Sequence, residues 1–222
     1  MSPAAALIID LVLNLIIAVS SAAVIISYFF SDADVGGEPE RKVTLRYFTT
    51  DSNILACLAA AVMTVCDAVA LASPGAGIPY FARILKYAGT VAVAVTICTV
   101  VLFLLPSALA AGNKSEAKAL FAGKAFVVHL STPVLSILSF VLFENAKGFT
   151  FAESLWTMLP AVVYSVVYLI MVVFVKRWPD FYGFTFGGKM YMVPVSIIGI
   201  YLLSLGAATL MRCVPPVPVT LQ

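Results

Sequence analysis

Residues 44–72 read TLRYFTTDSNILACLAAAVMTVCDAVALA and indicate what kind of protein this is. The apolar part of the stretch is long enough to cross a bilayer as one α-helix, which takes about 20 residues. Near its start stand five consecutive side chains that form hydrogen bonds, from Thr49 to Asn53. Polar groups at membrane depth are costly unless they face the bundle interior, a water-filled cavity or one another. The stretch therefore predicts a membrane helix with a polar site near its first turn.

The composition of the whole chain also indicates a membrane protein. Of its 222 residues, 62% are hydrophobic and only 11% are charged. A soluble domain carries about a quarter charged residues, so this chain lacks the polar side chains that a water-facing surface needs. The formal net charge of +2 is too small to indicate binding to nucleic acid, and we expect no such partner.

Hydropathy predicts an all-α polytopic membrane protein, a single domain built as a bundle of six transmembrane helices. The predicted spans cover about residues 3–30, 44–72, 80–105, 125–143, 155–175 and 190–211. No basic residues precede the first apolar run, which is too long for the core of a signal peptide. We therefore interpret that run as a retained first helix.

Lys and Arg are divided unevenly between the two sides of the predicted bundle. The loops after spans one, three and five, with the adjoining helix ends, hold Arg41, Lys42, Arg46, Lys114, Lys118, Lys124, Lys176, Arg177 and Lys189. The opposite side holds only Arg83, Lys86, Lys147 and Arg212. Because basic loops tend to stay in the cytoplasm, we expect both termini to lie outside.

Two polar residues of the opening stretch share one face of the predicted helix. Thr49 and Asn53 lie four residues apart, and we expect that face to point into the bundle. Thr50 turns aside from the face, whereas Ser52 stays near it. The alternative is a helix cap, since such side chains bond free amides at helix starts. A cap accounts for one or two residues, so five in a row favour a site.

His129 is the only histidine, and it lies within the fourth predicted span. Histidine is the side chain whose ordinary pKa lies near neutrality, which suits a general base. Pro133 follows four residues later and cannot donate the helical hydrogen bond to the carbonyl of residue 129. We expect a kink and a polar pocket there, which Thr132 helps to line. A core histidine bonded to a neighbouring span is the alternative.

Other polar residues at membrane depth are candidates for the same pocket. They are Asp10 and Asn14, one turn apart on span one, and Tyr164 and Tyr168, one turn apart on span five. The alternatives are an interfacial position for Asp10 and a packed face for the tyrosines. Asp67 and Glu144 lie near span ends, where we expect carboxylates at the membrane interface without a functional role.

A hydroxyl, an imidazole and nearby hydrogen-bond donors can carry out nucleophilic acyl chemistry. The imidazole takes the proton of the Thr49 hydroxyl as that oxygen attacks the acyl carbonyl, then returns it to the leaving group. Asn53 and Ser52 are candidates to donate to the oxyanion, and Asp10 or Asp51 to orient the imidazole. This chemistry needs no metal or cofactor, and we expect none. A site at membrane depth suits a lipid ester that enters from the bilayer.

The quoted stretch also resembles a known family. FTTDSNIL, at residues 48–55, is similar to the FT-x-x-SN-x-L signature of prokaryotic six-transmembrane proteins. Those proteins are related to the androgen-induced and androgen-dependent TFPI-regulating membrane proteins of animals. HLSTP, at residues 129–133, resembles the family's histidine helix. The segment that begins at Trp156 and ends with residues 179–183 is similar to the family's later pattern of Trp, Pro and Tyr.

The resemblance covers spans two to five and implies a function. The animal members are hydrolases of fatty acid esters of hydroxy fatty acids, with a threonine nucleophile and a histidine. Carried over by motif, these residues are Thr49 and His129, with Thr50 as an adjacent rival nucleophile. Residues 51–53 differ from the animal version, so the substrate need not be the same. A bacterial inner membrane is the implied location.

The leading hypothesis is thus an intramembrane threonine hydrolase whose partners are membrane lipids or lipid-like esters. One alternative is a small-solute or proton transporter that uses the same polar cluster as its binding site. Such a transporter would have broken half-helices and a path to both sides of the membrane. The other is a structural membrane protein in which these residues only cap and pack. The sequence does not predict an oligomeric state.

Overall fold

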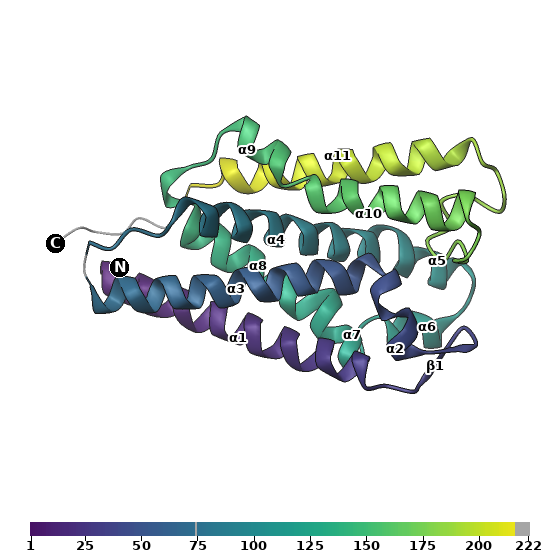
Figure 1. The fold of residues 1–222 in the computed structure, drawn as a ribbon, viewed down its shortest axis with the longest axis horizontal. Helices are drawn as coiled ribbons and strands as arrows, with labels where there is room; N and C mark the ends of the chain where they lie inside the picture. Colours follow the sequence, from purple (N-terminus) through teal and green to yellow (C-terminus); the bar gives the residue numbers. More distant parts are fainter. Residues whose placement is uncertain (74, 216–222) are drawn as a thin grey trace.

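The computed structural model describes residues 1–73 and 75–215, and within them the chain forms a helical bundle with almost no sheet (Figure 1). In this described part, six helical segments are long and apolar enough to cross a membrane. They are Pro3–Phe29, Phe48–Ala72, Tyr80–Ala110, Lys124–Leu142, Phe151–Phe174 and Met192–Cys213. The predicted all-α bundle of six membrane helices is confirmed.

Three of the spans are single α-helices, namely α1 (Pro3–Phe29), α3 (Phe48–Ala72) and α11 (Met192–Cys213). The other three are composite, and each contains a π-helical turn. The third span joins α4 (Tyr80–Thr99), η2 (Val100–Leu104) and α5 (Leu105–Ala110). The fourth joins α7 (Lys124–Phe126), η3 (Val127–Ser131) and α8 (Thr132–Leu142). The fifth joins α9 (Phe151–Trp156), α10 (Leu159–Leu169) and η5 (Ile170–Phe174).

Short elements connect the spans. After α1, β1 (Asp34–Val35) pairs antiparallel with β2 (Glu38–Pro39), and α2 (Glu40–Val43) and the 3-10 turn η1 (Thr44–Arg46) follow. The remaining connectors are α6 (Lys114–Ala119) and the 3-10 turn η4 (Glu144–Lys147). The second span therefore begins at Phe48 rather than at residue 44, because Tyr47 is extended and separates η1 from α3.

The span that contains α4 lies at the centre of the bundle and has the largest buried share. Figure 1 shows α1 and α3 on one side of α4 and α10 and α11 on the other, and α4 contacts α3, α8, α10 and α11. At Gly89 the α3 and α4 backbones approach so closely that a Cβ would lie 3.2 Å from Cα of Ala56. Small residues allow such close contact between membrane helices.

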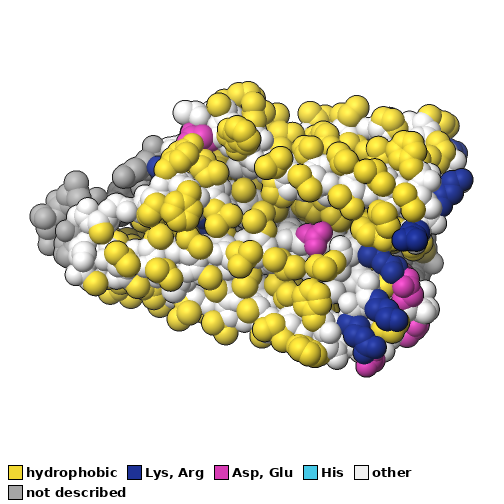
Figure 2. All heavy atoms as spheres, in the orientation of Figure 1, with side chains coloured by type: hydrophobic (Ala, Val, Ile, Leu, Met, Phe, Trp, Pro, Cys, Tyr) yellow, Lys and Arg dark blue, Asp and Glu magenta, His cyan; other side chains and the backbone are white. Residues whose placement is uncertain are grey.

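The outer surface of the bundle suits contact with lipid. Figure 2 shows apolar side chains over most of the visible face, whereas Lys and Arg gather at the end where α2 and α6 lie. Large apolar side chains on several spans point outward, among them Val19, Leu58, Leu102 and Leu202. A soluble protein rarely exposes so continuous an apolar surface. The chain is therefore an integral membrane protein.

Candidate functional site

Thr49 and His129 line the same cavity, which has a volume of about 240 Å³. Thr49 lies in the first turn of α3, and His129 lies in the π-helical turn η3 of the fourth span. The hydroxyl of Thr49 and the imidazole are not hydrogen-bonded to each other in the described structure. A molecule in the cavity can nevertheless contact both side chains. The structure thus brings together the two residues to which the sequence assigns catalysis.

Thr49 also lines a second, mainly apolar cavity of about 40 Å³. Its walls come from the start of α3, the end of α4 with η2, α10 and α11, and they include Val95, Ala161 and Ile200. Tyr182, in the loop before α11, lines both cavities as Thr49 does. Thr49 therefore lies between a cavity with an imidazole in its wall and a narrow apolar cavity in the bundle.

The hydrogen bond of His129 fixes the tautomer of its imidazole. Nδ1 lies 2.7 Å from the carbonyl oxygen of Leu120, just after α6. A carbonyl oxygen only accepts hydrogen bonds, so Nδ1 carries the ring proton and Nε2 of the neutral ring has a free lone pair. Nε2 has no hydrogen-bond partner among the described residues. When neutral, the imidazole therefore presents the unprotonated Nε2 that a general base requires.

Asn53 connects the helix of Thr49 to the turn of His129. Its Nδ2 donates to the carbonyl of Thr49 at 2.7 Å and to the carbonyl of Val128 at 3.1 Å. The side chain is fully buried, and both amide hydrogens are used in these two bonds. Asn53 therefore positions the two segments and has no hydrogen left for an oxyanion, in contrast to the expected donor role.

The hydroxyls next to Thr49 are already hydrogen-bonded. Ser52 Oγ lies 2.8 Å from Thr96 Oγ1 on α4 and 3.0 Å from the carbonyl of Thr49. Thr50 Oγ1 lies 3.2 Å from Thr44 Oγ1, and both side chains are buried. By contrast, the Thr49 hydroxyl is half-buried and forms no hydrogen bond with the described part of the chain. Among these hydroxyls, that of Thr49 is the one free to react.

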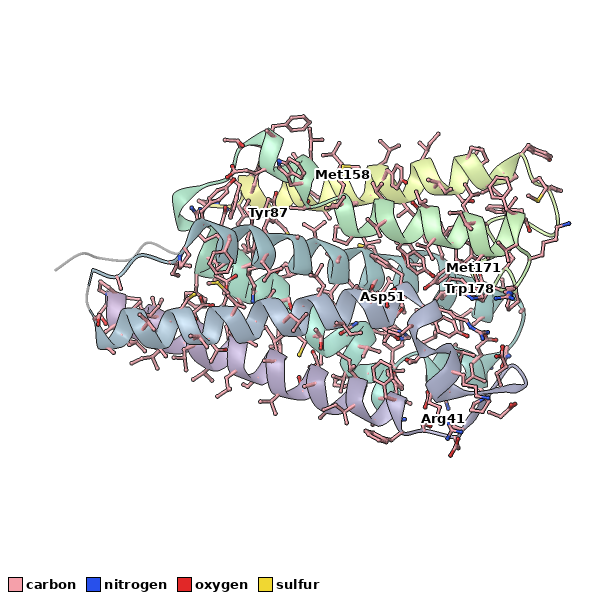
Figure 3. The ribbon with its side chains drawn as sticks, viewed as in Figure 1. Arg41, Asp51, Tyr87, Met158, Met171 and Trp178 are labelled. Atoms are coloured by element: carbon pink, nitrogen blue, oxygen red, sulfur yellow. The ribbon has the colours of Figure 1, made fainter. Side chains whose placement is uncertain are left out.

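Asp51 faces away from the imidazole. It is half-buried and lines a separate groove of about 400 Å³ between α3, α10 and the loop that holds Trp178. Figure 3 shows Asp51 on α3, with Trp178 on the adjacent loop beyond it. Because the Nδ1 proton of His129 already bonds Leu120, the structure does not support Asp51 as the group that orients the ring.

The start of α3 is capped by a distant tyrosine rather than by its own polar residues. The N-cap position is Tyr47, whose side chain forms no capping bond. The amide of Phe48 instead donates to the hydroxyl of Tyr182 at 2.9 Å. The hydroxyl of Tyr164 donates to the carbonyl of Arg46 at 2.7 Å, just before the helix. Local capping therefore does not explain the five polar residues, and Tyr182 joins the site.

Asp180 holds the loop that carries Tyr182. Its carboxylate accepts hydrogen bonds from the Tyr168 hydroxyl at 2.8 Å, from the Phe184 amide at 2.9 Å, and from the amide and hydroxyl of Thr185 at 2.8 and 2.6 Å. Burial alone would raise the pKa of Asp180, but these hydrogen bonds outweigh burial and lower it. Burial raises the pKa of Tyr182 to about 12, so its hydroxyl is neutral at physiological pH.

Three other candidates lie away from the Thr49 cavity. Thr132 Oγ1 lies 2.8 Å from Ser21 Oγ and joins α8 to α1. Asp10 Oδ1 lies 2.7 Å from Ser139 Oγ, and Asn14 Nδ2 donates to Glu144 Oε1 at 2.9 Å. Asp10 therefore does not orient the imidazole, and neither Asp10 nor Asn14 helps to line the pocket.

Asp10 and Asn14 instead belong to a buried polar cluster toward the other end of the bundle, near the N-terminus in Figure 1. Asp67, Glu144 and Lys86 complete its charged groups, at 0%, 7% and 2% exposure. The expectation that Asp67 and Glu144 are interfacial carboxylates is wrong, because each meets a polar partner from another helix. Only the occurrence of a lysine and several acids in apolar segments signalled this cluster in the sequence.

Comparisons of the chain with protein-family models, with curated proteins and with solved structures find no match.

Proposed function

We propose that this protein is an intramembrane hydrolase of lipid-like esters, with Thr49 as nucleophile and His129 as general base. One observation carries the proposal. The only unbonded hydroxyl of the TTDSN stretch lines the same cavity as an imidazole whose Nε2 lone pair is free. Nucleophile and base in one pocket are the arrangement that acyl transfer requires.

The reaction follows from these two side chains. Nε2 of His129 takes the Thr49 proton while Oγ1 attacks the ester carbonyl, and the imidazolium then protonates the departing alkoxide. The product alcohol leaves, and the acyl group stays on Thr49 as an ester. A water molecule, deprotonated by the same imidazole, attacks that ester and releases the carboxylic acid. Thr49 recovers its proton, so the enzyme is unchanged after each cycle.

The oxyanion needs a hydrogen-bond donor other than Asn53. Tyr182 fits this role, because it lines both cavities beside Thr49 and its hydroxyl oxygen accepts a hydrogen bond from the Phe48 amide. A hydroxyl that accepts one bond still has a hydrogen to donate. Preorganised donors of this kind contribute about 3–4 kcal/mol to acyl transfer in well-studied hydrolases.

The narrow apolar cavity beside Thr49 suits part of an acyl chain, which supports fatty acid esters of hydroxy fatty acids or similar lipids as substrates. Such a substrate agrees with the resemblance of residues 48–55 to the prokaryotic six-transmembrane family. The basic end of the bundle then faces the cytoplasm of a bacterial cell, with both termini outside the inner membrane.

An activity-based fluorophosphonate probe tests the proposal on the full chain in detergent micelles. Wild type and Thr49→Ser keep a hydroxyl at position 49 and should be labelled, whereas Thr49→Ala should not. Thr50→Ala is the matched control and should retain labelling, and His129→Ala should slow it by about 100-fold or more. Labelling that disappears in Thr50→Ala but persists in Thr49→Ala would move the nucleophile. No labelling in any form would contradict the hydrolase and favour a transporter.

A further inference from the structure

Six buried side chains from five elements form one hydrogen-bonded network toward the end of the bundle that holds the N-terminus. They are Asp10 and Asn14 of α1, Asp67 of α3, Lys86 of α4, Ser139 of α8 and Glu144 of η4. None of them is more than 7% exposed. Ionisable groups at such positions in a membrane protein are costly, and they commonly mark a site for an ion or a proton.

Lys86 and Asn14 supply the nitrogen donors of the network. The Lys86 ammonium donates to Asn14 Oδ1 and to Ser139 Oγ at 3.2 Å, and it forms an ion pair with Glu144, whose Oε1 lies 3.4 Å away. The Asn14 amide has two hydrogens, which point to Glu144 Oε1 at 2.9 Å and Asp67 Oδ2 at 3.4 Å. Glu144 Oε1 therefore accepts a hydrogen bond from the Asn14 amide and forms an ion pair with the Lys86 ammonium, and both contacts favour the ionised form of this carboxyl group.

Ser139 has fewer hydrogens than its neighbours need. Its Oγ lies 2.7 Å from Asp10 Oδ1 and 3.1 Å from Glu144 Oε1, and it accepts from Lys86. A hydroxyl donates one hydrogen, so it satisfies only one of two ionised carboxylates. The other contact would place oxygen lone pairs face to face unless that carboxyl carries a proton. Since Glu144 forms the ion pair with the Lys86 ammonium, Asp10 is the group that carries the proton.

The net charge of the cluster also favours a bound proton. Three ionised carboxylates and one ammonium leave the cluster two negative charges in excess, on side chains that are at most 7% exposed. Two further oxygens, Asp67 Oδ1 and Glu144 Oε2, are buried without a hydrogen-bond partner in the described structure. A metal cation would have to lie beside the Lys86 ammonium, which repels it. A proton removes negative charge without that repulsion.

We propose that Asp10, Ser139 and Glu144 form a binding site for one proton inside the membrane-spanning bundle, with Asp10 protonated at neutral pH. Asp10 donates its proton to Ser139 Oγ, and Ser139 donates its own to Glu144 Oε1. A shift of both hydrogens along these bonds moves the proton from Asp10 to Glu144 and leaves the hydroxyl of Ser139 intact. The charged groups that face Asp10 are Asp67, Lys86 and Glu144. The site is independent of the Thr49 chemistry.

Infrared spectroscopy of the full chain in lipid nanodiscs tests this proposal directly. We expect wild type at neutral pH to show the carbonyl stretch of a protonated carboxylic acid that shifts in D₂O. The band should disappear in Asp10→Asn and remain in Asp34→Asn, which removes an exposed carboxyl. The band should also disappear from wild type on titration to alkaline pH.

Two results would overturn the proposal. One is the absence of a protonated-acid band in wild type at neutral pH, a measurement that needs no variant to fold. The other is a band that survives unchanged in both Asp10→Asn and Glu144→Gln, since the proton would then lie on a carboxyl outside the Asp10–Ser139–Glu144 site. Neither result bears on probe labelling at Thr49.

Discussion

At the scale of single residues, the polar side chains of residues 49–53 differ in whether their hydrogen-bonding atoms already have partners. Thr50 and Ser52 bond other hydroxyls, and Asn53 bonds two carbonyls. The Thr49 hydroxyl has no hydrogen-bond partner in the described structure, and Thr49 lines a cavity that His129 also lines. A reactive hydroxyl has to be free to approach its base and its substrate, so unused hydrogen-bonding capacity is evidence for reactivity here.

Asn53 should control the position of His129 without taking part in the reaction. Asn53→Leu keeps a similar volume but leaves the carbonyls of Thr49 and Val128 without its two hydrogen bonds. Unpaired buried polar groups cost about 1–3 kcal/mol each, so both thermal stability and the rate of probe labelling should fall. Ser52→Ala is the control and should change the labelling rate much less. Unchanged labelling in Asn53→Leu would contradict the positioning role.

Lys86 should matter far more for stability than a lysine at the surface. Lys86→Met leaves the Glu144 carboxylate buried without its ammonium partner and should reduce the free energy of unfolding by about 3–5 kcal/mol. The control Lys124→Met breaks the partly exposed pair with Glu40 and should change it by less than about 1 kcal/mol. Denaturant unfolding in detergent at neutral pH measures both. Equal effects would contradict burial of the Lys86 charge.

At the scale of elements, distant segments determine the shape of the site. The first turn of α3 is capped by Tyr182, and the π-helical turn η3 is tied to α3 by Asn53. π-helical turns within α-helices frequently occur at functional sites, and here one carries the only histidine. The loop before α11 is thus part of the site, although it lies outside the membrane spans.

The Asp180 carboxylate should stabilise the fold at neutral pH and lose this effect in acid. Because the pKa of Asp180 is lower in the folded chain than the ordinary value of about 4, its carboxylate stabilises the fold above that value. This contribution is lost as pH falls through the lowered pKa. Asp180→Asn should therefore lower the unfolding temperature at neutral pH and slow probe labelling, with a smaller difference from wild type under strongly acidic conditions. A difference that grows on acidification would contradict this assignment.

The contact between α3 and α4 should not tolerate a larger residue at Gly89. Gly89→Leu places side-chain atoms against the α3 backbone, where even a Cβ would lie 3.2 Å from Ala56, and should cost about 1–3 kcal/mol or more. Gly199→Leu is the matched control, because nothing lies within 4 Å of a Cβ on Gly199 of α11. Thermal unfolding in detergent compares the two. A Gly89→Leu variant as stable as Gly199→Leu would contradict the close approach.

At the scale of the whole molecule, the bundle carries two polar regions toward opposite ends. The Thr49 cavity lies toward the basic end, and the Asp10 cluster lies toward the end with the N-terminus (Figures 1 and 2).

If the basic end faces the cytoplasm, a cysteine placed at Gly77 should react with a membrane-impermeant thiol reagent added to intact cells. A cysteine at Lys118 should not, in a Cys213→Ser background that removes the exposed native thiol. The reverse pattern would invert the topology.

The sequence predicts the six spans because a bilayer requires long apolar runs, whatever the contacts between helices. It also predicts the pairing of Thr49 with His129, through the polar stretch, the lone histidine and a family resemblance. It does not predict the partners of Asp67 and Glu144, because these depend on which helix faces touch across the bundle. The sequence likewise does not predict that the Tyr182 hydroxyl accepts a hydrogen bond from the Phe48 amide, since 134 positions separate the two residues.

Mass spectrometry of the probe-labelled wild-type chain can identify the nucleophile without any variant. After proteolysis, the phosphonate adduct should map to Thr49 in the peptide that contains the TTDSN stretch, and His129→Ala should strongly reduce its yield. An adduct on Thr50, on Ser52 or on any residue outside that stretch would show that Thr49 is not the nucleophile.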